Sequence, residues 1–145
     1  MSLFQLLSVS ASGMAAQRTR AETITENLAN AETTRTPEGG PYRRKDVVFA
    51  SASQSSPFGS VFQQALGPQV EGVEVNELIT DTREPEKRYQ PGHPDADKDG
   101  YVAFPRIAPA EEMVNLMGAS RGYQANVNAM LAVRDMLHRS LDMLK

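Results

Sequence analysis

The residues best suited to chemistry in this chain lie in one short acidic run, residues 95–100 (DADKDG). Its spacing matches the first half of an EF-hand loop, in which alternate carboxylates bind calcium. A complete loop needs a bidentate acid at its twelfth position, and that position holds Arg106, a cation. We therefore expect a polar turn in which Gly100 adopts a positive φ. A weak calcium-binding module stays as the alternative interpretation.

The other candidates for chemistry are two histidines and a pair of carboxylates. His93 and His138 lack the clustered neighbours that a metal site needs. Glu111 and Glu112 are adjacent in a predicted helix, so they point in different directions and do not form an acid–base pair. The sequence contains no nucleophile, phosphate-binding or dinucleotide motif. We therefore predict no enzymatic activity, no cofactor and no metal.

Charge and cysteine content exclude further classes of protein. The formal net charge is -3, which argues against nucleic acid as a partner because phosphates demand a basic surface. The basic run Arg43-Arg44-Lys45 is interpreted as a solvated loop. The chain has no cysteine, so disulfides and thiolate metal sites are excluded. The first basic residue is Arg18 and the apolar run before it is broken, so we expect neither a cleavable signal peptide nor direct membrane insertion.

The candidate residues described above lie on or between two predicted helices. The first helix is predicted over residues 3–31. Asn27 and Asn30 favour a boundary near its end, because asparagine tolerates a left-handed cap. Apolar or small residues recur at alternating intervals of three and four positions along it, as expected for one buried face, except where Arg18 and Thr25 take the intervening positions. This stripe contains Phe4, Leu7, Ala11, Met14, Ala21 and Leu28, and Ile24 widens it.

The second helix is predicted over residues 109–144, with Pro109 in a first turn that needs no N–H from it. A mostly apolar heptad follows and is typical of a coiled-coil seam. Its positions are Met113, Leu116, Ser120, Tyr123, Val127, Met130, Arg134, Leu137, Leu141 and Leu144. A second apolar or small set lies beside the heptad, at Ala119, Ala129, Val133, Met136 and Met143.

Between the helices the sequence predicts a small antiparallel β unit. The strand candidates are residues 45–50, 70–79 and 101–104, where β-branched and aromatic residues are frequent. Residues 51–60 are rich in Ser and Gln and predict a mobile loop. Prolines at positions 85, 91 and 94 exclude a long regular element there.

The predicted fold is therefore mainly α with a small β part. Long N- and C-terminal helices pair antiparallel as a coiled-coil-like bundle, with a loop-rich antiparallel β segment between them. Residues 1–34 and 109–145 form the terminal helical domain, and residues 35–108 form the β segment.

The two helices carry more apolar surface than a two-helix hairpin hides, and contiguous exposed apolar surface usually marks an assembly interface. We expect that interface at Phe4, Leu7, Ala11, Met14, Ile24, Leu28, Met113, Leu116, Tyr123, Val127, Met130, Leu137 and Leu141.

Four stretches of the sequence resemble a known family. Residues 10–34, which contain Asn27, Asn30 and Thr33, are similar to the N-terminal signature of bacterial flagellar rod and axial proteins. Residues 40–49 (GPYRRKDVVF), 88–102 and 111–127 resemble the proximal-rod branch of that family. The resemblance covers almost the whole chain apart from residues 51–69.

This resemblance implies a structural subunit of the flagellar basal body, in the periplasmic rod, exported by the flagellar type III apparatus without a cleavable signal peptide. It implies helical assembly with itself and with the rod proteins FlgB and FlgF, with FlgG and FliE as further candidates. The product would be a torque-transmitting shaft around the export channel. Asn27, Asn30 and Thr33 would form a helix-exit motif. The alternative is a coiled-coil secretion-system adaptor that forms a closed oligomer.

Overall fold

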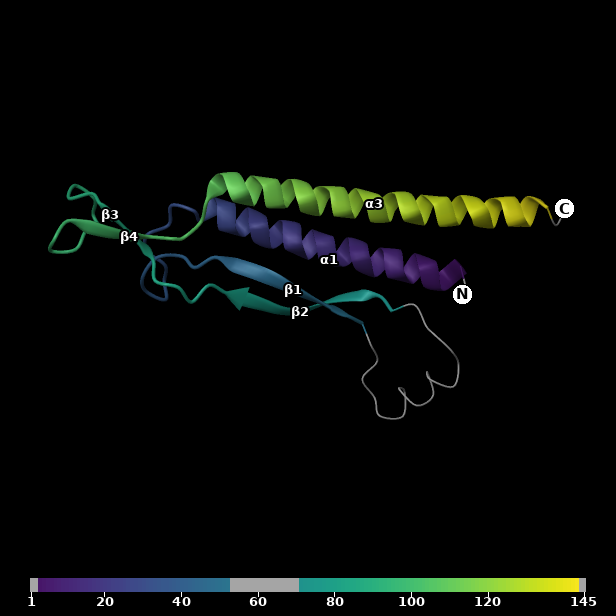
Figure 1. The fold of residues 1–145 in the computed structure, drawn as a ribbon, viewed down its shortest axis with the longest axis horizontal. Helices are drawn as coiled ribbons and strands as arrows, with labels where there is room; N and C mark the ends of the chain where they lie inside the picture. Colours follow the sequence, from purple (N-terminus) through teal and green to yellow (C-terminus); the bar gives the residue numbers. More distant parts are fainter. Residues whose placement is uncertain (1–2, 53–70, 144–145) are drawn as a thin grey trace, which may run out of the picture.

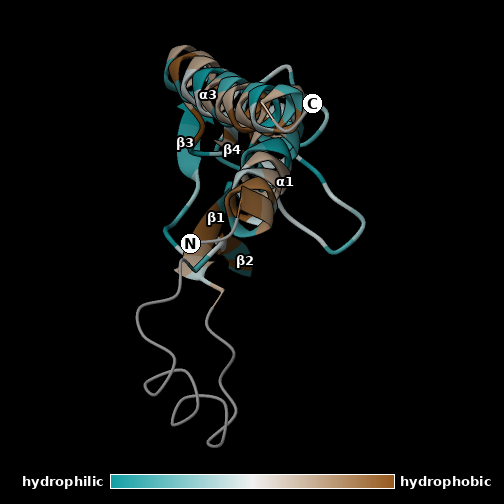
Figure 2. Ribbon diagram, turned by 90° about the vertical axis from the view of Figure 1, so that its right-hand side faces the viewer, coloured by the Kyte–Doolittle hydropathy of each residue, from teal (hydrophilic) through white to brown (hydrophobic). Residues whose placement is uncertain are grey.

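The molecule is elongated and has three layers in its middle part, where the β1–β2 ribbon lies (Figure 1). The computed structural model describes residues 3–52 and 71–143. Its elements are α1 (Leu3–Ala29), β1 (Lys45–Ser51), β2 (Val73–Thr80), β3 (Glu86–Tyr89), β4 (Tyr101–Phe104) and α3 (Pro109–Asp142). Helix α1 lies between α3 and the β1–β2 ribbon, and the β3–β4 hairpin projects beyond the end at which α3 begins (Figures 1 and 2).

The predicted fold class is confirmed. The two terminal helices run antiparallel, so that the start of α1 and the end of α3 lie at the same end of the molecule (Figure 1). Helix α3 begins at Pro109, as predicted, and extends past the start of α1. Helix α1 ends at Ala29, two residues before the predicted boundary.

Close approach of the two helices depends on glycines. A Cβ built at Gly13 would lie 2.7 Å from Oδ1 of Asn126, and one built at Gly122 would lie 3.0 Å from Cδ of Gln17. Ala119 is fully buried on the same side of α3. The absence of side chains at these two glycines therefore leaves room for the longer side chain opposite each of them.

The β1–β2 ribbon is antiparallel, with Lys45 opposite Thr80 and Ser51 opposite Val73, and its register shifts between Val48 and Phe49. It is tied to α1 near one end by Ser12, whose Oγ accepts a hydrogen bond of 3.0 Å from the Val73 N–H. The strands predicted over residues 45–50 and 70–79 are found, although residue 70 and most of the loop predicted over residues 51–60 lie outside the described residues.

The second hairpin pairs β3 with β4 and contains a strand that we did not predict from the sequence. Strand β3 is four residues long and fits between the prolines at positions 85 and 91. On β4, Val102 is fully buried and Phe104 nearly so, with the Arg88 guanidinium carbon 4.9 Å from the centre of the Phe104 ring. Gly100, in the turn between the strands, has a φ of 80° as predicted.

Candidate functional site: the helix exit and the outer face of α3

The predicted heptad of α3 only partly faces α1. Leu116, Val127, Met130 and Leu137 are half-buried, but Met113, Tyr123 and Leu141 are exposed. The most buried positions of the helix are instead Glu112, Ala119 and Val133. They lie one residue before the heptad positions Met113, Ser120 and Arg134. The most buried stripe is therefore rotated by one position from the heptad, and three of the large heptad side chains are left exposed.

The predicted positions on α1 are also divided between the interior and the surface. Ile24 is buried, and Leu7, Met14 and Leu28 are half-buried. Phe4 is 74% exposed, and Ala11 is exposed as well. One side of α1 thus belongs to the interior of this chain, while its first turns present apolar surface.

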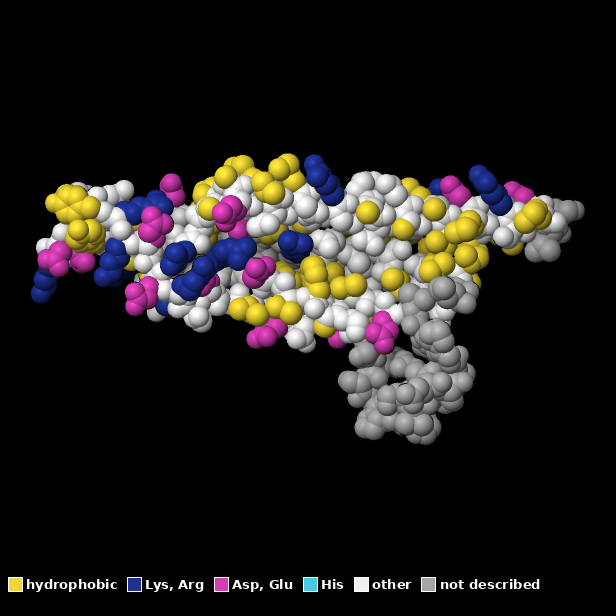
Figure 3. Space-filling view, in the orientation of Figure 1, with side chains coloured by type: hydrophobic (Ala, Val, Ile, Leu, Met, Phe, Trp, Pro, Cys, Tyr) yellow, Lys and Arg dark blue, Asp and Glu magenta, His cyan; other side chains and the backbone are white. Residues whose placement is uncertain are grey.

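Three large apolar residues form an outer apolar patch on the first turns of α3. Met113, Val114 and Met117 are 53%, 62% and 52% exposed. Figure 3 shows hydrophobic side chains gathered on the outer side of α3 near its start, away from α1. Further along the helix, Leu131 and Met136 are exposed as well. Val114 was not among the interface residues predicted from the sequence.

At the exit of α1, Asn27 is fully buried and has hydrogen bonds on both sides of its amide. Its Nδ2 donates to the Lys45 carbonyl at 2.7 Å, and its Oδ1 accepts from the Lys45 N–H at 2.9 Å. The Tyr42 hydroxyl donates to the same Oδ1 at 3.1 Å. The side-chain amide therefore pairs with the first residue of β1 as a neighbouring strand would, and fixes that strand to the helix.

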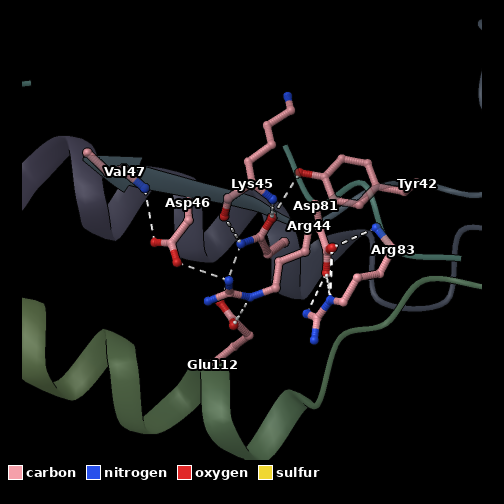
Figure 4. A network of polar contacts seen from close by, with 9 residues as sticks. Tyr42, Arg44, Lys45, Asp46, Val47, Asp81, Arg83 and Glu112 are labelled. Carbon is pink, nitrogen blue, oxygen red and sulfur yellow. Dashed lines mark hydrogen bonds and ion pairs between the residues drawn. The ribbon is translucent and has the colours of Figure 1, made fainter. Parts of the chain in front are cut away.

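A buried carboxylate from α3 completes a group of residues that we call the helix-exit cluster. Its members are Asn27, Tyr42, Arg44, Lys45 and Glu112. Glu112 is 2% exposed and accepts hydrogen bonds from Nε of Arg44 at 2.8 Å and from Nδ2 of Asn27 at 3.4 Å. Figure 4 shows Arg44 reaching from β1's start to Glu112, with Asp46 on its other side. Burial lowers the pKa of Arg44, but its hydrogen bonds to Glu112 and Asp46 outweigh that effect, and the net pKa is raised. The guanidinium therefore stays charged beside the buried acid.

Asn30 and Thr33 lie in the turn that follows α1. The Asn30 Nδ2 donates to the Glu26 carbonyl at 3.0 Å, and the same carbonyl accepts the Asn30 backbone N–H at 3.1 Å, so Asn30 closes the last turn of the helix twice. The Thr33 hydroxyl donates to Oδ1 of Asn30 at 3.1 Å, and the Thr33 carbonyl accepts from the Tyr42 N–H at 3.0 Å. The helix boundary predicted near Asn30 is found, but without the left-handed cap, because no non-glycine residue in the described ranges has a positive φ. The asparagines act through their side chains.

The acidic run is folded into the turn between β3 and β4. Asp97 Oδ1 accepts from the backbone N–H groups of Asp99 and Tyr101, each at 2.9 Å, and Asp95 Oδ2 accepts from Thr34 at 2.8 Å. Within residues 3–52 and 71–143, no group of three or more His, Cys, Asp or Glu side chains is placed to hold a metal ion. The same residues include no helix long and apolar enough to cross a membrane.

Most of the helix-exit cluster was not predicted from the sequence. The basic run Arg43-Arg44-Lys45 was interpreted as a solvated loop, which is wrong for Arg44, because its guanidinium is paired with a buried acid. Lys45 begins β1, as the strand predicted over residues 45–50 requires. Glu112 was interpreted only as one of two adjacent acids in a first helical turn. The signal that was available is weak: Glu112 lies one position outside the apolar heptad, on the side where Ala119 follows one heptad later.

Comparison with known proteins gives consistent results at both ends of the chain. Residues 7–35 match the family model described as flagella basal body rod protein, and residues 98–143 match the one described as flagellar basal body rod FlgEFG protein C-terminal. The flagellar basal-body rod protein FlgC of Bacillus subtilis is 40% identical, with all of both chains covered. FlgC of Borreliella burgdorferi is 36% identical over 100% of this chain and 99% of its own. FlgC of Salmonella typhimurium is 39% identical over 97% of each.

The chain belongs to the FlgC family of flagellar basal-body rod proteins. The chain is therefore a structural subunit of the flagellar rod, as the resemblance in the sequence implied. The two matched segments contain the two helices that pack against each other: most of α1 lies within the first match, and α3 lies within the second. The outer apolar patch and two members of the helix-exit cluster, Asn27 and Glu112, thus lie in the parts of FlgC that these models describe.

Proposed function

We propose that this FlgC family member is a proximal-rod subunit that assembles helically with itself and with the rod proteins FlgB and FlgF. FlgG and FliE are further candidate neighbours. Its terminal helices pack beside those of neighbouring subunits into a tube that transmits torque and encloses the export channel. The subunit reaches the periplasmic rod through the flagellar type III export apparatus. Family membership supports the rod as its location, and the outer apolar patch supports the assembly step.

The outer apolar patch is the observation that carries this proposal. Single exposed apolar residues are common on soluble proteins, but Met113, Val114 and Met117 are neighbours in space and each is more than half exposed. On a helix, residues three and four apart share a face, so Met113 and Met117 present one continuous surface. Clusters of this kind mark surfaces that a partner covers. Within this chain α1 covers the opposite side of α3, so the partner comes from another molecule.

The test replaces one patch residue by a charge and by an apolar residue of similar size. Met117→Asp should abolish swimming and remove the protein from purified basal bodies, because a charge buried in an apolar interface is costly. Met117→Leu, the matched control, should swim and assemble normally. The purified Met117→Asp chain should melt at the temperature of the parent chain. Normal swimming of Met117→Asp would contradict the proposal.

A closed coiled-coil oligomer is the alternative that uses the same surface. Sedimentation of the purified chain over a range of concentrations distinguishes the two. A single species of fixed stoichiometry that persists on dilution would favour the closed oligomer. Rod assembly predicts instead that the chain forms no such species by itself.

A further inference from the structure

At several positions the contact between α1 and α3 is made by small and polar residues. Gly13 faces Asn126, Gly122 faces Gln17, and Ala119 is fully buried. Large interlocking side chains resist sliding because each one leaves its own hole. Small residues give a shallower relief at these positions. They therefore leave a role for a second determinant of the longitudinal register of the helix pair.

The helix-exit cluster has the properties of such a determinant. Glu112 is 2% exposed and is hydrogen-bonded to Arg44 at 2.8 Å and to Asn27 at 3.4 Å. Sliding α3 by one helical turn moves it about 5.4 Å along α1, which separates Glu112 from both partners. A buried carboxylate without its partners is strongly destabilising. The cluster therefore tolerates one register and penalises the adjacent ones.

The same cluster also fixes β1. The Asn27 amide pairs with both the N–H and the carbonyl of Lys45, and Arg44 precedes Lys45 in the chain. A shift of α3 would therefore break the contact of α3 with the segment that begins β1 as well as its contact with α1. Three segments that are remote in sequence thus meet at one buried point.

We propose that Asn27, Arg44 and Glu112 form a register latch that holds the two terminal helices and β1 at a single longitudinal offset. The offset determines where the outer apolar patch lies relative to α1 and the ribbon. The latch belongs to the single chain, so it can be measured without assembly and does not depend on the proposed function.

The absence of cysteine allows the register to be measured with a disulfide ruler. One cysteine is placed on α3 by Asn126→Cys, and a second on α1 by Val9→Cys, Gly13→Cys or Gln17→Cys in three separate double variants. The pair at positions 13 and 126 reports the observed register, since a Cβ at Gly13 lies 3.0 Å from Asn126 Cγ and so falls within disulfide range. The other two pairs report a slip of one turn in either direction. Mass spectrometry under non-reducing conditions separates monomers from disulfide-linked dimers, and only disulfides within the monomer are counted.

In the otherwise unchanged full chain, we expect the pair at 13 and 126 to dominate after mild oxidation. With Glu112→Ala, the ratio of this crosslink to the sum of the two slipped ones should fall about tenfold or more. The matched control is Glu26→Ala, which removes the exposed ion pair between Glu26 and Lys45 next to the cluster and should leave the ratio unchanged. Glu112→Gln, which keeps an acceptor and a similar shape, should restore most of the ratio.

Two results would overturn the latch. The first is equal crosslinking of all three cysteine pairs in the otherwise unchanged chain, because the helix pair then has no single register. The second is a ratio that Glu112→Ala leaves intact. If Glu112→Ala does not melt cooperatively, Arg44→Met is measured in the same way, because it leaves the buried carboxylate without its cation while preserving side-chain length. An intact ratio in Arg44→Met likewise overturns the proposal.

Discussion

Gly13 on α1 lies directly against Asn126 on α3, so close that a Cβ at Gly13 would be 2.7 Å from the Asn126 Oδ1. The Asn126 side chain is held in place by a hydrogen bond of 2.9 Å from its Nδ2 to the Gly122 carbonyl. This glycine, which weakens α1 as an isolated helix, is thus the residue that lets α3 approach.

Alanine substitutions at two helical glycines should therefore have opposite effects. Gly118→Ala should raise the free energy of unfolding by about 1 kcal/mol, because nothing lies within 4 Å of the added Cβ. Gly13→Ala gains the same helix propensity but forces Asn126 from its hydrogen bond, so it should be less stable than Gly118→Ala and no better than the parent. Urea denaturation of the purified chains measures both. Equal stabilisation by the two substitutions would show that the helices do not pack closely at Gly13.

Charges on the two sides of α3 should be separable in the isolated chain. Val127 is half-buried at the helix pair, so Val127→Asp should lower the free energy of unfolding by on the order of 2 kcal/mol and also abolish swimming. Leu137→Asp should behave in the same way. Met117→Asp, on the outer apolar patch, should change stability by less than about 0.5 kcal/mol. Thermal melts of the three purified variants check this, and equal melting of all of them would refute the assignment of sides.

Stability should fall at alkaline pH through Tyr42. Burial raises the pKa of the Tyr42 hydroxyl from 10.0 to about 12, and the nearby Glu26 and Glu112 carboxylates add to the effect. A pKa that is higher in the folded chain gives stability that is complete below pH 10 and is lost as the pH rises through about 12. Tyr42→Phe should be less stable at pH 7, because the hydrogen bond to Asn27 is gone, but its stability should decline less between these two pH values.

Urea midpoints of the parent and Tyr42→Phe chains at a series of pH values measure this difference. The other titrating groups are common to both chains, so the difference between the two curves isolates Tyr42. Parallel curves would contradict the prediction.

The turn between β3 and β4 should tolerate alanine at one glycine and not at the other. Gly100 has a φ of 80°, and a Cβ there would lie 2.9 Å from the Tyr89 ring. Gly100→Ala should therefore destabilise the hairpin by about 1–2 kcal/mol. Gly92→Ala, in the same connection, meets nothing within 4 Å and serves as the control. Hydrogen exchange of the Gln90 amide, which donates to the Gly100 carbonyl at 2.9 Å, should accelerate only in Gly100→Ala.

The parts of the fold that depend on local signals were predictable from the sequence. Periodicity and Pro109 located α3, and the β-branched and aromatic residues of β1, β2 and β4 located three strands. Strand β3 was missed because four residues between prolines carry no periodic signal. The heptad located only part of the side of α3 that faces α1, because the buried residues Ala119 and Val133 belong to the second set beside it. The burial of Glu112 could not be predicted, because it depends on Arg44, 68 positions away.

The two helices differ in reach, since α3 continues past the start of α1 while the hairpin of β3 and β4 occupies the far end (Figure 1). The subunit accordingly has one slender single-helix tip and one broad β tip. Two unlike tips give any head-to-tail stack of such subunits a direction, because reversing one member would bring like tips together. A shaft made from this chain would therefore have an intrinsic polarity that follows from the shape of the single subunit.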